Sequence, residues 1–210
     1  MNTRFCMVRH GETDWNIEKR IQGHIDISLN ATGLAQADAA ARRLAGQAFD
    51  AAYSSDLDRA WQTARVIGQR LDLDVRRTPD LRERHYGILQ GLTAEEIATK
   101  YPEAYRHYLV RNPQCCFETG ESLEDFSARI IAAIESLAAK HPGQNLLLIF
   151  HGGVLDVCYR RATGRDLASP RDFPIPNAAF NWLEVGPTGW QLVSWADHRH
   201  LTQSLEESPE

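Results

Sequence analysis

The sequence predicts an α/β protein: a three-layer α/β/α sandwich with a mostly parallel sheet, one antiparallel edge, and a helical insertion over the candidate active site. Three observations predict it. Short apolar runs alternate with segments of helical period, which is typical of a parallel sheet covered on both faces. Two strand-like segments near the C-terminal end are joined by a short turn. Residues 79–121 carry little strand pattern and are rich in Pro, Tyr and charge.

The first third of the chain predicts three strands and two helices. Residues 5–8 and 51–53 are short runs dominated by apolar residues, and residues 75–78 form a short third strand. Alanines at helical spacing predict a helix over Thr32–Leu44. The segment DRAWQTARVIGQRL, Asp58–Leu71, repeats its apolar residues with the period of a helix.

The middle of the chain carries two helix starts and the most apolar strand. Thr93-Ala94-Glu95-Glu96 is a capping box, so a helix begins there and ends near Pro102. Ser122 is a suitable N-cap for a long amphipathic helix that reaches Lys140. The strand NLLLIF covers residues 145–150, and a helix follows from His151-Gly152-Gly153 to about Thr163.

The C-terminal segment predicts the antiparallel edge. Strands over Phe180–Val185 and Trp190–Trp195 flank the turn Gly186-Pro187-Thr188-Gly189. The acidic stretch Ser204–Glu210 is expected to fray. A tryptophan cluster at positions 182, 190 and 195 fits either a core or a homodimer interface, so the sequence leaves the oligomeric state open.

Length and composition predict one domain over residues 1–210, with a lid-like insertion at about 79–121. Hydrophobic residues make up 43% and charged residues 24%, an ordinary globular balance. The net charge of −5 argues against a nucleic-acid partner, because such proteins usually carry a basic patch. No apolar run has the length of a membrane span, and no signal peptide is visible. We therefore expect a cytoplasmic protein without a membrane partner.

The cysteines and histidines do not predict a metal site. Cys6, Cys115, Cys116 and Cys158 form no C-x-x-C pair, so in the cytoplasm they are expected to be free thiols. His198 and His200 are the nearest approach to a metal motif, but they lie close to a polar tail. We expect neither a metal nor a cofactor.

Polar clusters follow three of the predicted strands. They are Arg9-His10-Gly11, the segment Ser54–Arg59, and His151-Gly152-Gly153. In open α/β sheets the carboxyl ends of the strands form the active crevice, so these clusters should converge. Two arginines and two histidines would then surround one site. Each cluster alone could be unremarkable, since a single Arg-His-Gly occurs by chance in many proteins.

Such a convergence suits a phosphate. Arginine presents a planar fork that matches phosphate oxygens, and the glycines let backbone N–H groups approach closely. The helix beginning near Gly152 adds its positive N-terminal end. Nearby arginines also lower the pKa of a histidine, which keeps an imidazole neutral and able to act as a nucleophile.

These residues together resemble the histidine phosphatase superfamily, in its phosphoglycerate-mutase-like branch. The matching stretches are Arg9-His10-Gly11-Glu12-Thr13 with Asn16, Gln22-Gly23, Leu29-Asn30 with Gly33, Ser55-Asp56-Leu57 with Arg59-Ala60 and Gln62-Thr63-Ala64, Glu83, and His151-Gly152. The resemblance implies a metal-independent phosphomonoester hydrolase that works through phosphohistidine on a small phosphorylated metabolite. It implies that His10 is the nucleophile and Glu83 the proton donor. It also implies that Arg9, Arg59 and His151 bind the phosphoryl group, with Asn16, Gln22, Gly23 and Gly152 helping.

Two features divide the prediction between a phosphatase and a phosphoglycerate mutase. Glu83-Arg84-His85-Tyr86-Gly87 resembles the mutase stretch in which Arg84 and Tyr86 would contact substrate. The mutase segment with paired arginines has no match, however; Asn112–Phe117 and then Gly120-Glu121-Ser122 stand there, as in the superfamily's phosphatases. The span from Glu83 to His151 is also much shorter than in the mutases, and a shortened lid should admit water, which favours hydrolysis.

Two further questions stay open. A phosphoester-binding module without activity is the least favoured alternative, because residues of the expected type occupy all the core positions of the family's motif. Arg84, Tyr86, His107 and Arg111 could meet a polar or anionic leaving group, or could be solvated surface residues.

Overall fold

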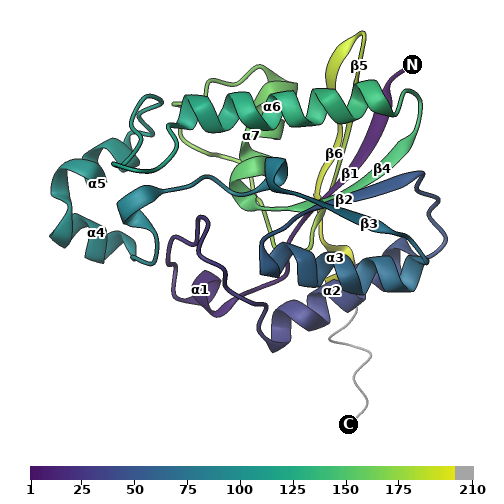
Figure 1. Cartoon of the computed structure of the whole chain (residues 1–210), viewed down its shortest axis with the longest axis horizontal. Coiled ribbons are helices and arrows are strands. Elements are labelled where there is room, and N and C mark those ends of the chain that lie inside the picture. Colours follow the sequence, from purple (N-terminus) through teal and green to yellow (C-terminus); the bar gives the residue numbers. More distant parts are fainter. Residues whose placement is uncertain (202–210) are drawn as a thin grey trace.

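A computed structural model describes residues 1–201 of the chain. Within this part, six strands form one sheet in the order β3-β2-β4-β1-β5-β6, with helices on both faces (Figure 1). The strands are β1 (Thr3–Arg9), β2 (Ala51–Ser55), β3 (Val75–Thr78), β4 (Asn145–Phe150), β5 (Phe180–Gly186) and β6 (Gly189–Asp197). The helices are α1 (Asp14–Ile17), α2 (Ala31–Leu44), α3 (Asp58–Leu71), α4 (Ala94–Lys100), α5 (Pro102–Leu109), α6 (Leu123–Lys140) and α7 (Gly152–Thr163). Two 3₁₀ turns, η1 (Pro79–Leu81) and η2 (Gly87–Leu89), lie in the 79–121 segment.

The sheet is parallel except at β5. Strands β3, β2, β4 and β1 run in one direction, and β5 pairs antiparallel with both β1 and β6. The predicted α/β class and antiparallel edge are therefore confirmed. Because β1, β2 and β4 are parallel neighbours, their carboxyl ends lie together on the same side of the sheet. The three polar clusters begin at these strand ends.

Alternate residues of a central strand pack into two separate hydrophobic layers, one on each face of the sheet. In β1, Phe5 and Met7 join a cluster with α6 and α7, whereas Cys6 and Val8 join a cluster with α2 and α3. Successive side chains of a strand point to opposite faces, so a central strand that is covered twice must be apolar throughout. Figure 1 shows α6 and α7 on one side of the sheet and α2 and α3 on the other.

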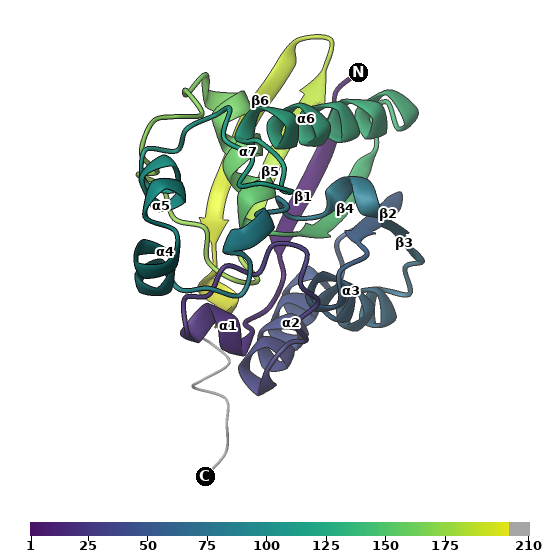
Figure 2. The same ribbon diagram turned by 60° about the vertical axis from the view of Figure 1, so that its left-hand side comes forward.

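The 79–121 segment forms a small layer of its own beside the sheet edge. Leu89, Ile97 and Phe117 are its buried centre, and α4 and α5 pack around them. Figure 2 shows α4 and α5 standing together at the side of the molecule, next to the segment that carries α1. Helix α5 was not predicted: Pro102 follows the end of α4 and also begins α5, since the first turn of a helix tolerates proline.

Helix ends agree closely with the predicted caps. Thr93 and Glu96 form the capping box of α4, and the Ser122 hydroxyl accepts from the Asp125 N–H at the start of α6. Strand β2 is longer than predicted and includes Ser54 and Ser55. The short helix α1 was not predicted; Thr13 and Asn16 form its capping box. The Ser204–Glu210 prediction lies outside the described residues.

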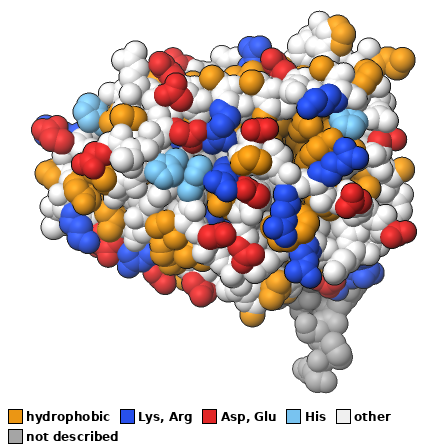
Figure 3. Space-filling view, viewed as in Figure 1, with side chains coloured by type: hydrophobic (Ala, Val, Ile, Leu, Met, Phe, Trp, Pro, Cys, Tyr) orange, Lys and Arg blue, Asp and Glu red, His pale blue; other side chains and the backbone are white. Residues whose placement is uncertain are grey.

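Acidic and basic side chains are interspersed over the face shown in Figure 3. All four cysteines are free thiols, as predicted, and burial raises the pKa of Cys6 and Cys158 far above its usual range. None of the helices over residues 1–201 combines the length and apolar character needed to cross a lipid bilayer.

Candidate active site

The carboxyl ends of β1, β2 and β4 bring the two histidines together. Arg9 is the last residue of β1 and is paired in register with Phe150, the last residue of β4. His10 and His151 follow these two strands, and their ring centroids are 5.3 Å apart. The convergence predicted from the strand ends is present in the structure.

His10 is held with one nitrogen free. Its Nδ1 lies 2.7 Å from the carbonyl oxygen of Gly11, and the ring is 3% exposed. A carbonyl can only accept, so Nδ1 carries the proton and Nε2 keeps its lone pair. The side-chain amide of Asn177 donates to the His10 carbonyl at 2.9 Å and fixes the backbone from a distant segment.

Two arginines flank His10, and each keeps an unused donor. Arg9 donates through Nη1 to the Ile175 carbonyl, and Arg59 donates through Nη1 and Nη2 to the carbonyls of Ile25 and Gly23. The Nε atoms of both arginines are buried and have no partner in the described part of the chain. Burial lowers the pKa of both guanidinium groups to about 10, while the charge of Glu83 acts in the opposite direction.

His151 is fully buried beside the same arginines. Its Nε2 lies 2.8 Å from the Ser55 hydroxyl, and its Nδ1 has no hydrogen-bond partner among the described residues. Ser55 Oγ already accepts from the Leu57 N–H at 3.3 Å, so its own proton is available for His151 Nε2. When Ser55 donates to Nε2, the remaining imidazole proton lies on Nδ1, which is then a donor.

Both histidines are kept neutral. The pKa of His10 lies well below its usual value because of burial first, then the charges of Arg59 and Arg9. The pKa of His151 is lowered by burial first, then by Arg59, His10 and Arg9. Arginine charge was the predicted cause of this effect, whereas removal of the rings from water is the larger cause.

Glu83 lies opposite the helix start of α7. Its Oε2 accepts from the Gly153 N–H and its Oε1 from the Arg84 N–H, both at 2.9 Å. A Cβ at Gly153 would stand 2.1 Å from Oε1, so only glycine leaves room for this carboxylate. The predicted role of the glycines differs here: the N–H of Gly153 holds Glu83, and the N–H of Gly11 donates to Thr63.

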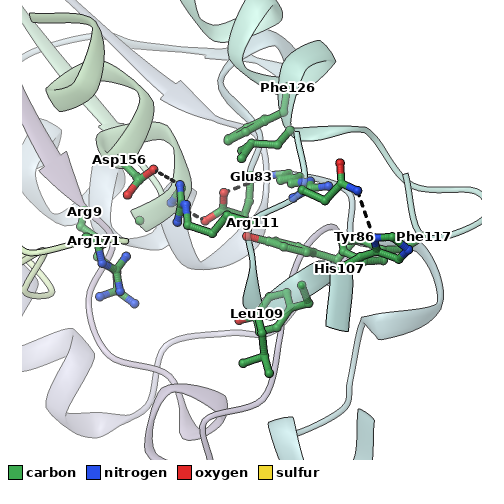
Figure 4. A pocket seen from close by; sticks show the side chains of 16 residues that line it. Arg9, Glu83, Tyr86, His107, Leu109, Arg111, Phe117, Phe126, Asp156 and Arg171 are labelled. Carbon is green, nitrogen blue, oxygen red and sulfur yellow. Dashed lines mark hydrogen bonds and ion pairs between the residues drawn. The ribbon is translucent and has the colours of Figure 1, made fainter. Parts of the chain in front are cut away.

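Two neighbouring cavities open beside these residues. The first, of about 380 Å³, we call the His10 cavity. The second, of about 440 Å³, we call the Asp156 cavity, and Figure 4 shows it. They share five lining residues, namely Arg9, Glu83, Tyr86, Tyr108 and Arg171. Glu83 therefore stands at the boundary between the two cavities.

Most of the predicted site residues line at least one cavity. Arg9, His10, Asn16, Gln22, Gly23, Arg59, Glu83 and Tyr86 line the His10 cavity, and Arg84, His107, Arg111 and Gly152 line the Asp156 cavity. His151 lines neither cavity; it is fully buried, with its ring centroid 5.3 Å from that of His10.

Several of these residues also have structural partners. The Asn16 Oδ1 caps α1, Gln22 donates to Thr13, and the Gly23 carbonyl holds Arg59. Arg84 donates to the carbonyls of Cys115 and Glu121.

Asp156, Tyr108 and Arg171 belong to the site but were not predicted, and Ser55 was predicted only as part of the Ser54–Arg59 cluster, without a role of its own. Asp156 accepts from Arg111 at 2.6 Å and from Arg160 at 2.9 Å. Arg171 comes from the irregular segment before β5, where no periodic pattern marks it. Ser55 had a signal, since it ends β2 and lies in the polar stretch that reaches Arg59. Within residues 1–201, no three His, Cys, Asp or Glu side chains are grouped so that they could ligate a metal ion.

Neutral histidines at this site should make the protein sensitive to mild acid. The folded state keeps His10 neutral, whereas the unfolded chain protonates it below pH of about 6.5, so stability is fully present above that pH and falls as the pH decreases. Between pH 7.5 and 5.5 His10 should account for about 1.4 kcal/mol of the loss. Urea unfolding of the wild type and of His10→Asn at both pH values measures this. Equal losses in both proteins would contradict it.

The chain is similar in sequence and in structure to proteins of one known family. The family model described as the histidine phosphatase superfamily (branch 1) matches residues 5–198. A metal-independent phosphoserine phosphatase of Arabidopsis thaliana is 41% identical over 203 residues, covering 95% of this chain and 84% of that protein. Phosphoglycerate mutase-like protein 4 of the same plant is 37% identical over 202 residues, covering 94% and 86%. The solved structure of a phosphoserine phosphatase from Entamoeba histolytica with phosphoserine has a TM-score of 0.85 at 27% identity, covering 95% of this chain and 99% of that chain.

Proposed function

Because this chain belongs to the histidine phosphatase superfamily (branch 1), we propose that it hydrolyses phosphomonoesters with His10 as its nucleophile. The chain is an enzyme of the phosphatase type. The observation that carries the assignment of His10 is the free Nε2, left by the hydrogen bond from Nδ1 to the Gly11 carbonyl and surrounded by cations.

The phosphoryl group is proposed to bind among three donors around His10. Arg9 Nε, Arg59 Nε and His151 Nδ1 are all buried without a partner among residues 1–201. A buried donor without a partner costs about 1–3 kcal/mol, and a bound ligand or an ordered water can satisfy it. Phosphoryl oxygens would satisfy all three. The positive charge that a metal ion supplies in other phosphoryl-transfer enzymes would come here from the arginines.

In the first step, the His10 Nε2 lone pair attacks phosphorus and the bond from phosphorus to the leaving oxygen breaks. Glu83, in its acid form, gives its proton to that oxygen, and a neutral alcohol departs. The position of Glu83 supports this role, because it lines both cavities and so stands where the leaving oxygen would lie. The alcohol part of the substrate would then occupy the Asp156 cavity.

In the second step, water replaces the alcohol. Glu83, now a carboxylate, takes a proton from water while the water oxygen attacks phosphorus. The bond from phosphorus to Nε2 breaks, its electron pair returns to His10, and inorganic phosphate leaves. One carboxyl group can serve both steps because the first leaves it in the form that the second requires.

The 79–121 segment is proposed to act as a lid over the alcohol part of the substrate. It contributes Glu83, Arg84, Tyr86, Tyr108 and Arg111 to the walls of the cavities. Arg111 also joins the segment to α7 through its ion pair with Asp156 at 2.6 Å. The substrate class is a small phosphorylated metabolite, and O-phosphoserine is the first to test, since a relative named for that substrate has the highest identity reported above.

Phosphoglycerate mutase activity is the second candidate, because Arg84 and Tyr86 line the Asp156 cavity as the mutase resemblance implies. A mutase must return the phosphoryl group to a bound product before water reaches it. The Asn112–Phe117 segment offers no arginine pair that would retain such a product. Hydrolysis is therefore the activity that we propose.

The test is phosphate release by the purified full-length chain. We expect hydrolysis of p-nitrophenyl phosphate and O-phosphoserine that EDTA changes by no more than about twofold, because the residues of the site supply the charge. Interconversion of 3- and 2-phosphoglycerate is assayed in parallel, with and without 2,3-bisphosphoglycerate. Interconversion faster than phosphate release would overturn the hydrolase assignment, and loss of hydrolysis in EDTA would overturn the metal-independent mechanism.

A further inference from the structure

Arg171 is an unpaired cation on the wall that both cavities share. It lines the His10 cavity and the Asp156 cavity, and Figure 4 shows it beside Arg9. In the described part of the chain it has no hydrogen bond and no ion pair. Its charge helps to lower the pKa of Arg9, after burial, which places the two guanidinium groups within electrostatic range.

The other cations of the Asp156 cavity are already engaged. Arg111 pairs with Asp156, and Arg84 donates to two carbonyl oxygens and packs over the rings of Tyr86 and Phe117, at 5.1 Å from each ring centroid. Arg9 turns one nitrogen to the Ile175 carbonyl and keeps Nε for the phosphoryl site. Arg171 is thus the cation with its whole guanidinium available to the alcohol part of a substrate.

The base of Arg171 is anchored although its tip is exposed. Asp172 forms an ion pair with Arg165, and the buried ring of Phe173 stacks on Tyr159 with 3.8 Å between centroids. The Pro174 carbonyl accepts from the Trp195 indole at 2.7 Å. The backbone next to Arg171 is therefore fixed, and the side chain extends into the cavity from a stable support.

We propose that Arg171 binds a carboxylate on the leaving alcohol, so that this enzyme selects phosphorylated amino or hydroxy acids over the corresponding phosphorylated amines and alcohols. A guanidinium fork pairs with a carboxylate through two parallel N–H donors. One unpaired cation matches the single negative charge of a carboxylate better than the dianion of a second phosphate. This inference rests on the proposed function, since it places the alcohol in the Asp156 cavity.

Two matched pairs of substrates test the proposal. O-phosphoserine and O-phosphoethanolamine differ by the carboxylate alone, and 3-phosphoglycerate and glycerol 3-phosphate differ by a carboxylate in place of a hydroxymethyl group. We expect the wild type to prefer the carboxylated member of at least one pair, which also identifies the amino or hydroxy acid. In Arg171→Met, kcat/KM for that member should fall about 10- to 100-fold, while its partner loses much less. Arg171→Lys should keep part of the preference.

Arg161→Met is the control for the loss of one positive charge. Arg161 lies on α7, faces Glu135 at 3.6 Å and lines neither cavity, so its replacement should leave the preference intact. Absence of a carboxylate preference in the wild type, or equal losses on both members of a pair in Arg171→Met, would overturn the proposal. Hydrolysis of p-nitrophenyl phosphate, which has no carboxylate, distinguishes a failure of the Arg171 proposal from a failure of the proposed function. If the wild type hydrolyses it but shows no carboxylate preference, only the role of Arg171 is wrong. If the wild type does not hydrolyse it, the proposed function is wrong as well.

Discussion

Replacing His10 with alanine should lower phosphomonoester hydrolysis on the order of 10⁴-fold or more, because the covalent route is lost together with its nucleophile. The free Nε2, the neutral ring and the three unpartnered donors around it carry this expectation. Steady-state phosphate release from O-phosphoserine and p-nitrophenyl phosphate measures the loss. Intact mass of the rapidly quenched wild type should show one added phosphoryl group, and that of His10→Ala none.

Two control measurements distinguish the loss of the nucleophile from a loss of folding. His198→Ala removes an exposed histidine far along the chain and should retain activity within about twofold, as surface substitutions usually do. His10→Ala keeps Arg9, Arg59 and His151, so it should still gain thermal stability from added inorganic phosphate. Undiminished turnover in a folded His10→Ala protein would remove His10 from the mechanism.

Replacing Glu83 with glutamine should separate the two chemical steps. An amide cannot donate the required proton, so phosphate release from O-phosphoserine should fall about 10²- to 10⁴-fold. The p-nitrophenolate ion leaves without a proton, so transfer of the phosphoryl group from p-nitrophenyl phosphate to His10 should be affected much less. The second step still lacks its base. Stopped-flow measurements should therefore show a burst of about one equivalent of p-nitrophenolate, followed by slow turnover.

The control for Glu83→Gln removes the same charge elsewhere in the 79–121 segment. Glu95 is exposed in the first turn of α4 and lines neither cavity, so Glu95→Gln should behave like the wild type. If Glu83→Gln slows the burst phase and O-phosphoserine hydrolysis by the same factor, Glu83 does not protonate the leaving oxygen. If Glu83→Gln hydrolyses O-phosphoserine at the wild-type rate, Glu83 acts in neither step.

Local signals were sufficient for most of the fold. The Thr93 capping box, the Ser122 cap and the apolar run at residues 145–150 act within a few neighbours, and the structure places elements where they predict them. The two helices that escaped prediction, α1 and α5, are short. Helix α1 has four residues and no buried side chain, and α5 packs on a small cluster that only the folded 79–121 segment creates.

Convergence at the sheet edge was predictable for a topological reason. Parallel strands place their carboxyl ends together, so clusters that follow β1, β2 and β4 had to meet. The partners of those side chains were not predictable in the same way. That the Gly153 N–H holds Glu83, and that Gly11 donates to Thr63, depends on how segments of the chain far apart in sequence come within about 3 Å of each other.

The sequence by itself determined the α/β architecture, the strand ends that carry Arg9, His10 and His151, and the family to which these motifs belong. Only the tertiary structure decided which nitrogen of each histidine is free, that burial outweighs the arginines in keeping both rings neutral, and that Arg171 stands unpaired between two cavities. The physical reason is one of range. Periodicity and caps report interactions within one element, whereas a tautomer, a pKa or a free guanidinium depends on every group that the fold brings within a few ångströms.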